Sequence, residues 1–424
     1  MRSKAILLAL ALGLLAALPA AVGLAQAGPT VTDRGVENRF PEGIAFSVAA
    51  QSDAPIQNVR LRYKVLPDGT AATGVPDFQP GTSVVTAFTL AGNNPPRIYL
   101  PPGTTIEYHW EVTDANGSVA TTETATLFYD DVRFDWSSLE AGGVTVYYYA
   151  GSADDARAML DTAAETLSSM SDLLGTTVSF PVKVWIYDSV ADMRPALARR
   201  SETFEESVIT AGVRVASDTV LVLGTASFDT LRHELTHIVT AVAGEGAFGD
   251  LPAWLDEGTA VYAQRDPEGF REAIERAVER GNVLSIHSIT SQQGDPARVS
   301  LFYGQSWSLV SYLIDTYSQA KFAQLFAGIK SGRTTDEALL AAYGFDQDGL
   351  EDEWRASLGL PPEEEPTPAD QLPEPTLPSS ATGSPAQRAG GGTSVGLIIG
   401  LLLGTLALAG AVGGLGLFLA RRLR

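Results

Sequence analysis

The sequence predicts a multidomain protein in which an all-β sandwich precedes a larger α+β domain, a Pro-rich stalk and one transmembrane helix. Three observations support this architecture. The 424 residues are enough for two or three domains with cores of their own. Short runs of alternating polarity up to about residue 130 give way, after residue 131, to a mixture of strand-like and helical segments. An apolar segment occupies each end of the chain.

Residues 1–27 have the pattern of a secretory signal peptide. Arg2 and Lys4 precede a long apolar stretch, and an Ala-x-Ala cleavage motif occupies positions 25–27. The alternative is a membrane anchor that is never cleaved, which the regular run of small residues disfavours. We therefore expect the mature chain to begin at Gly28.

The other end of the chain predicts a membrane anchor on a stalk. Residues 361–394 are rich in Pro, Glu and Gly, a composition that favours a disordered, extended segment. Residues 395–420 carry no charge and are numerous enough to cross a bilayer as a helix. The basic tail 421–424 is expected in the cytoplasm, which places the domains outside the cell. The alternative is a sorting signal that is cut before anchoring, although the LPxTG pattern of one such system is absent.

Composition excludes several classes of function. A net charge of −21 argues against nonspecific binding of nucleic acid or of an anionic membrane surface. Because the chain has no Cys, it has no disulfide scaffold, iron–sulfur cluster or thiol nucleophile. Any metal site must use Asp, Glu or one of only 4 His. The oligomeric state is not predicted by the sequence.

Residues 28–130 predict a small antiparallel sandwich. Four runs alternate apolar and polar residues, and Pro- and Gly-rich turns separate them; the runs are 59–65, 83–90, 106–112 and 119–129. Their number and spacing fit an immunoglobulin-like domain that lacks the Cys pair. His109 lies in one of these strands between Tyr108 and Trp110, and with no second ligand type nearby we expect a structural or exposed role for it.

Residues 131–360 predict one α+β domain whose strands come early and whose helices come late. Strand-like runs at 144–149 and 182–187 flank a helical stretch from about Ala153 to Leu174. A further run at 217–224 has the character of an edge strand, which can hold an extended peptide by backbone hydrogen bonds. From Phe228 to Leu358 almost every segment has helical spacing.

The first of these late helices carries the segment HELTH. Positions four apart lie on one face of a helix, so His233 and His237 can reach the same metal ion, and Glu234 projects beside them toward the attacking water. A catalytic zinc needs a third protein ligand and an open position. Glu257, on the next predicted helix, supplies that ligand, with Asp256 as a neighbouring competitor.

HELTH followed by WLDEGTAVY resembles the gluzincin metallopeptidases, closest to the peptidase-MA-like family and related in pattern to the aminopeptidase-N family. The resemblance covers about residues 134–359. It implies a thermolysin-like peptidase fold, one Zn²⁺ per chain, a peptide or protein substrate and Glu234 as general base. It also gives Tyr303, in the segment FYGQSWSLVSYL, the role of stabilising the tetrahedral intermediate, with plain core packing as the rival interpretation.

The choice between an endopeptidase and an aminopeptidase is predicted from a segment that the sequence lacks. Aminopeptidases of the related family carry a GxMEN segment whose Glu binds the substrate amine, and nothing similar occurs between Val208 and Phe228. We therefore expect an endopeptidase. The alternative from another class is a non-catalytic adhesion module that keeps the gluzincin fold, which the intact Glu234 disfavours. For His287, in the loop-like segment SIHSIT, a surface role is favoured over proton transfer.

Overall fold

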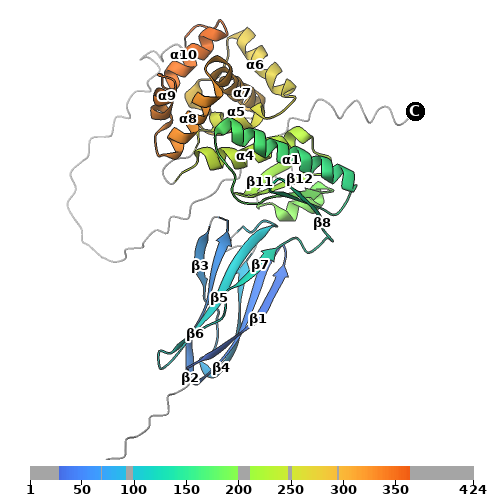
Figure 1. Cartoon of the computed structure of the whole chain (residues 1–424), viewed down its shortest axis with the longest axis vertical. Coiled ribbons are helices and arrows are strands. Elements are labelled where there is room, and N and C mark those ends of the chain that lie inside the picture. Colours follow the sequence, from blue (N-terminus) through green and yellow to red (C-terminus); the bar gives the residue numbers. More distant parts are fainter. Residues whose placement is uncertain are drawn as a thin grey trace, which may run out of the picture.

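A computed structural model of the chain describes residues 28–67, 69–91, 99–198, 211–246, 251–293 and 296–362. The described part consists of an N-terminal β domain, a second sheet and a set of helices, in that order along the molecule (Figure 1). The predicted signal peptide, the stalk beyond residue 362 and the predicted transmembrane segment 395–420 lie outside these residues. Among the helices that are described, none is long and apolar enough to span a bilayer.

The N-terminal domain is built on one long strand that pairs with different partners along its length. The first half of β2 (Gly43–Leu66) pairs with β1 and β4, and its second half pairs with β3 and β5. Tyr108 of β5 donates a hydrogen bond to Asp33 of β1 at 2.7 Å, so the two parts face each other. The other strands are β1 (Thr30–Arg39), β3 (Thr70–Gly74), β4 (Gly81–Ala91), β5 (Thr104–Asp114), β6 (Val119–Thr121) and β7 (Ala125–Tyr129). The prediction of an all-β N-terminal part is confirmed.

The second sheet has the order β11-β12-β10-β9-β8. Strand β10 pairs in parallel with both of its neighbours, and the two outer strands are antiparallel to theirs. The strands are β8 (Ser137–Ala141), β9 (Val144–Tyr148), β10 (Val182–Tyr187), β11 (Gly212–Ala216) and β12 (Thr219–Leu223). The prediction that 217–224 forms an edge strand is therefore wrong: β12 lies inside the sheet, and β11 ends the described sheet.

Strands β10 and β12 of the second sheet are buried on both faces, and by different partners. Val220 and Val222 of β12 belong to a core shared with the helices, whereas Leu221 and Leu223 belong to a core shared with the N-terminal domain. Side chains alternate between the faces of a strand, so one sheet joins two cores. In Figure 1 the sheet accordingly lies between the β domain and helices α1 and α4.

Helices make up most of the described residues after residue 227. Helix α1 spans Ala153–Leu174, as predicted, with a Ser152 capping box at its start and Gly175 at its end in the left-handed conformation. The later helices are α4 (Phe228–Gly244), α5 (Ala253–Tyr262), α6 (Glu268–Arg280), α7 (Val299–Thr316), α8 (Gln319–Lys330), α9 (Thr335–Ala342) and α10 (Gln347–Ser357). Short helical segments occur at Val190–Met193 (α2), Arg194–Ala196, Ile286–Ile289 and Pro296–Arg298.

Candidate metal centre

Helix α4 carries the HELTH segment into the interior of the molecule. It begins as predicted, because the side chain of Ser227 accepts a hydrogen bond from the backbone N–H of Thr230. Every residue from Leu231 to Thr240 is buried, so the histidines and Glu234 lie in a core rather than on a surface. A buried imidazole pair needs partners, and these come from α5 and from the residues that follow it.

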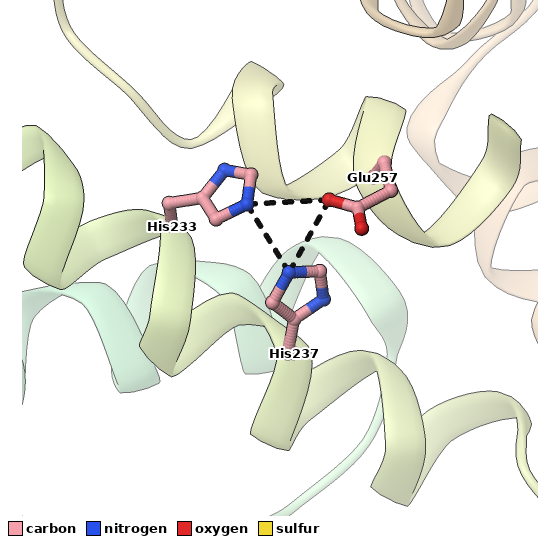
Figure 2. A group of neighbouring side chains, drawn as sticks. All are labelled: His233, His237 and Glu257. Atoms are coloured by element: carbon pink, nitrogen blue, oxygen red, sulfur yellow. Dashed lines mark hydrogen bonds and ion pairs between the residues drawn. The ribbon is translucent and has the colours of Figure 1, made fainter. Parts of the chain in front are cut away.

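Three ligand atoms converge between α4 and α5 (Figure 2). The Nε2 atoms of His233 and His237 lie 3.2 Å apart, and Oε2 of Glu257 lies 3.3 Å from the first and 3.5 Å from the second. Among the described residues this is the only group of three or more side chains that could hold a metal ion. His109 and His287 lie elsewhere, as expected.

These separations fit zinc. In a tetrahedral site with bonds of about 2.0–2.2 Å, ligand atoms lie about 3.3–3.6 Å from one another. Oε2 of Glu257 is also buried without a hydrogen-bond partner, which is costly unless a cation binds there. Two imidazoles and one carboxylate form a donor set that zinc prefers. The residues present therefore fit the ion that the sequence predicts.

Each ligand side chain is held from behind by a second polar group. Nδ1 of His237 lies 3.0 Å from Oδ2 of Asp256, and the other oxygen of Asp256 accepts a hydrogen bond from Thr240. The side-chain amide of Gln264 lies 3.1 Å from Nδ1 of His233. Gln292 donates a hydrogen bond of 3.0 Å to Oε1 of Glu257. Such partners fix the ring orientation and the ligating atom.

The structure distinguishes the two neighbouring candidates for the third metal ligand, Asp256 and Glu257. Adjacent helix positions point in directions about 100° apart, so only one of the two carboxylates can face the histidine pair. Glu257 does so, and Asp256 supports His237. Sequence reasoning missed Gln264 and Gln292, because no local spacing indicates an amide that becomes a partner only in the folded chain.

Glu234 lies beside the ligand cluster with one oxygen engaged and one free. Its Oε2 accepts a hydrogen bond of 2.9 Å from the backbone N–H of Arg214, in β11. Its Oε1 is buried and has no partner among the described residues. Burial raises the pKa of Glu234, while the nearby imidazoles oppose this shift. A carboxylate with a raised pKa and a free oxygen is suited to accept a proton.

The charges of the other groups depend on one another. Burial would raise the pKa of Glu257, but His237 and His233 hold it below its usual value. Asp256 behaves similarly, and His237 is the main cause that brings its pKa to about 2 despite burial. Burial would lower the pKa of His237, yet the two carboxylates raise it. His237 and the two carboxylates therefore favour one another's charged forms.

Tyr303 reaches the site from α7. Its ring lies 6.0 Å from that of His233, at an interplanar angle of 64°, and packs against Phe270 at 5.2 Å. Gln305 and Ser306 of the same helix do not join the ligand cluster. Gln305 instead binds both backbone groups of Leu284. The structure thus brings Tyr303 close to the histidines, but not Gln305 or Ser306.

Residues 162–359 match the family model of the peptidase MA superfamily. This match supports a zinc metallopeptidase of that superfamily. The protein is a zinc metallopeptidase, which confirms the prediction made from HELTH and WLDEGTAVY. No curated protein sequence matches the chain.

Solved structures of M1 zinc metallopeptidases resemble the metallopeptidase at low similarity. A point mutant of the enzyme from Deinococcus radiodurans is 13% identical, with 78% of this chain and 97% of that chain covered and a TM-score of 0.38. The unmutated Deinococcus radiodurans enzyme is 13% identical, with coverage of 77% and 92% and a TM-score of 0.35. A two-domain M1 mutant bound to L-arginine has the same identity and coverage and a TM-score of 0.37. At these TM-scores the likeness carries no argument about this chain.

Proposed function

We propose that His233, His237 and Glu257 hold one zinc ion and that Glu234 is the general base of peptide-bond hydrolysis. The observation that carries this proposal is the triangle of ligand atoms, 3.2, 3.3 and 3.5 Å apart, beside a carboxylate with one free oxygen. When bound, zinc would polarise the substrate carbonyl and make a water more acidic. The protein's own residues perform the remaining steps.

Glu234 moves the proton. Its free Oε1 accepts a proton from the attacking water, and the same carboxyl group then gives it to the leaving amine as the C–N bond breaks. Atom Oε2 stays bound to the N–H of Arg214, so the side chain need not turn between the two transfers. Tyr303 is proposed to donate a hydrogen bond to the oxyanion that forms on the substrate carbonyl. Its place beside His233 supports this role.

Strand β11 is the proposed binding site for an extended peptide. Leu223 donates a hydrogen bond to the carbonyl of Ala211, which makes this an antiparallel pair whose peptide groups face each other. By alternation, the peptide groups of Gly212 and Arg214 point away from β12. The N–H of Arg214 is bound to Glu234, so the groups proposed to pair with a substrate are the N–H of Gly212 and the carbonyls of Gly212 and Arg214. An extended substrate can pair with such a strand through its backbone.

The proposal includes endopeptidase activity. An aminopeptidase needs a carboxylate to bind the free amine of its substrate. The described strand β11 contains no acidic residue. The three buried carboxylates of the described centre are all engaged: Glu257 faces the histidines, Asp256 supports His237, and Glu234 is held by Arg214.

A peptide library in two forms tests this choice. The exported part of the protein, loaded with zinc, is incubated with peptides that have free or acetylated N-termini, and the products are identified by mass spectrometry. An endopeptidase cleaves both forms at internal bonds. Release of single residues from the free peptides alone would show an aminopeptidase. Stoichiometric zinc without any cleavage would instead support the non-catalytic binding module.

The location of the enzyme is proposed from the sequence pattern. The predicted signal peptide, stalk and segment 395–420 place the catalytic domain outside the cell on a single-pass anchor, with the tail 421–424 inside. Protease added to whole cells should then cut within 361–394 and release an active fragment. A catalytic domain that becomes accessible only after lysis would contradict this topology.

A further inference from the structure

We propose that Arg214 is a positioning residue that fixes the Glu234 carboxylate, an inference that rests on the proposed function. Arg214 contacts the HELTH turn twice. Its backbone N–H donates to Oε2 of Glu234 at 2.9 Å, and its guanidinium donates to the backbone carbonyl of His237 at 2.8 Å. A single residue of β11 thus joins the base and a metal-ligand residue.

The strand is built to lie close to the helix at this point. A Cβ added to Gly212 would lie 2.7 Å from Cγ2 of Thr230 and 3.2 Å from Cγ of Glu234. Only glycine leaves room for the backbone of β11 to approach α4 so closely. The pairing with β12 then shifts between Arg214 and Ala216, which ends the regular ladder next to the contact with Glu234.

The guanidinium is placed to keep β11 close to α4. The Arg214 side chain is only 13% exposed and spans from β11 to the carbonyl of His237, which also accepts from Thr240 at 3.2 Å. Its charge acts on Asp256, the carboxylate that supports His237. Pairing with β12 holds the backbone of β11, and the guanidinium adds a side-chain link from the same residue to the turn of α4 that carries Glu234 and His237. Without this link the 214 amide would hold the Glu234 carboxylate less firmly, and the unengaged oxygen could turn away from the substrate.

Three substitutions test the proposal. Arg214→Met keeps the length of the side chain without its charge, Arg214→Lys keeps the charge without the planar donor group, and Arg214→Ala leaves space for added methylguanidinium. Arg355→Met is the matched control, because Arg355 is also buried and also donates to a backbone carbonyl, that of Pro361. For each zinc-loaded variant we measure bound zinc, kcat, KM and amide hydrogen exchange of the peptide containing 212–216.

The proposal predicts a specific pattern. Arg214→Met should keep zinc and KM but lower kcat by about 10- to 100-fold, since misplacing a reacting group by about 1 Å has effects of this size. The kcat of Arg214→Lys should lie between those of the wild type and Arg214→Met. Added methylguanidinium should restore part of the kcat of Arg214→Ala. Hydrogen exchange at 212–216 should accelerate in Arg214→Met and stay unchanged in Arg355→Met.

Two results would overturn the role of Arg214. One is an unchanged rate of exchange at 212–216 in Arg214→Met. The other is a loss of activity that follows loss of zinc or of folded protein, with no rescue by methylguanidinium. A wild-type protein that binds zinc but cleaves no peptide would contradict the proposed function instead. The exchange measurement would still decide whether Arg214 positions Glu234.

Discussion

Val184 and Trp185 are consecutive residues of β10, yet their side chains lie in two different hydrophobic cores. Val184 packs with the helices of the peptidase part, and Trp185 packs with the N-terminal domain and stacks on Tyr147 at 4.2 Å. The β domain therefore covers one face of the sheet that carries the edge strand of the active site. The sheet of the peptidase part thus buries one of its faces against the β domain, and the two parts share a hydrophobic core.

Removing residues 28–130 should destabilise the peptidase part. The deletion exposes Trp185, Tyr187 and Leu221, which are all at most 1% exposed in the intact protein. A patch of this kind favours aggregation. We expect the fragment 131–362 to be insoluble or to unfold at a much lower temperature than 28–362, as measured by light scattering and thermal unfolding. A soluble fragment with an unchanged Tm would contradict the shared core.

Gly258 should be essential for placing Glu257. A Cβ at Gly258 would lie 2.3 Å from the backbone carbonyl oxygen of Ser306, so α5 and α7 would have to separate. Gly258→Ala should lower the free energy of unfolding by about 1–3 kcal/mol and reduce bound zinc. Gly269→Ala is the control, because a Cβ there meets nothing within 4 Å. The prediction fails if the two variants have equal stability and zinc content.

Gln292 should strengthen zinc binding although it is exposed. Its amide holds Oε1 of Glu257, which leaves Oε2 to face the histidines. Partners of metal ligands typically contribute about 10- to 100-fold in affinity. We expect Gln292→Ala to lose zinc more readily in a chelator competition than Gln293→Ala, its neighbour. Equal affinities in the two variants would show that Glu257 needs no such support.

His287 predicts a pH-dependent contribution to stability away from the active site. Its Nε2 lies 2.6 Å from Oδ1 of Asp348, and this hydrogen bond is the main cause that raises the pKa of His287. Burial opposes the shift, while the charges of Asp348, Asp336 and Glu351 add to it. The pair is therefore stabilising below the unfolded-state pKa of about 6.5 and loses this effect as the pH rises through the raised folded value.

The corresponding measurement compares Asp348→Asn with wild type at two pH values. At pH about 6 the substitution should lower the free energy of unfolding by about 0.2–1 kcal/mol, as for other exposed pairs. At pH about 9 the difference should shrink to the part that comes from the Asp348 charge in the first turn of α10. Asp352→Asn, on the exposed side of the same helix, controls for the change in net charge. A difference of the same size at both pH values would rule out titration of His287 as its cause.

The sequence predicts those parts of the fold that local patterns determine. Helix α1 and strand β10 match their predicted ranges, because a capping serine, a terminal glycine and an apolar run with turn signals act over a few residues. The order of strands does not follow from such signals, and for this reason the prediction of an edge strand at 217–224 is wrong. That order depends on which segments meet after long loops close.

The residues of the site also differ in how far the sequence predicts them. His233, Glu234 and His237 share one helical turn, so their common face is predictable from spacing alone. Glu257 needed a second motif and the resemblance to a family. Arg214 and Gln292 contact these residues only through the folded chain, from a strand and from a loop. Neither position carries a local signal that distinguishes it from an ordinary polar residue.

The most direct test of the account compares turnover at equal zinc content in wild type and Glu234→Gln. The amide has the shape of the carboxylate and leaves His233, His237 and Glu257 in place, but it cannot accept a proton. We predict one bound zinc per chain in both proteins and a loss of peptide hydrolysis in Glu234→Gln of at least about 10²-fold. Wild-type kcat in a zinc-loaded Glu234→Gln protein would contradict the assignment of Glu234 as the base, and with it the proposed mechanism.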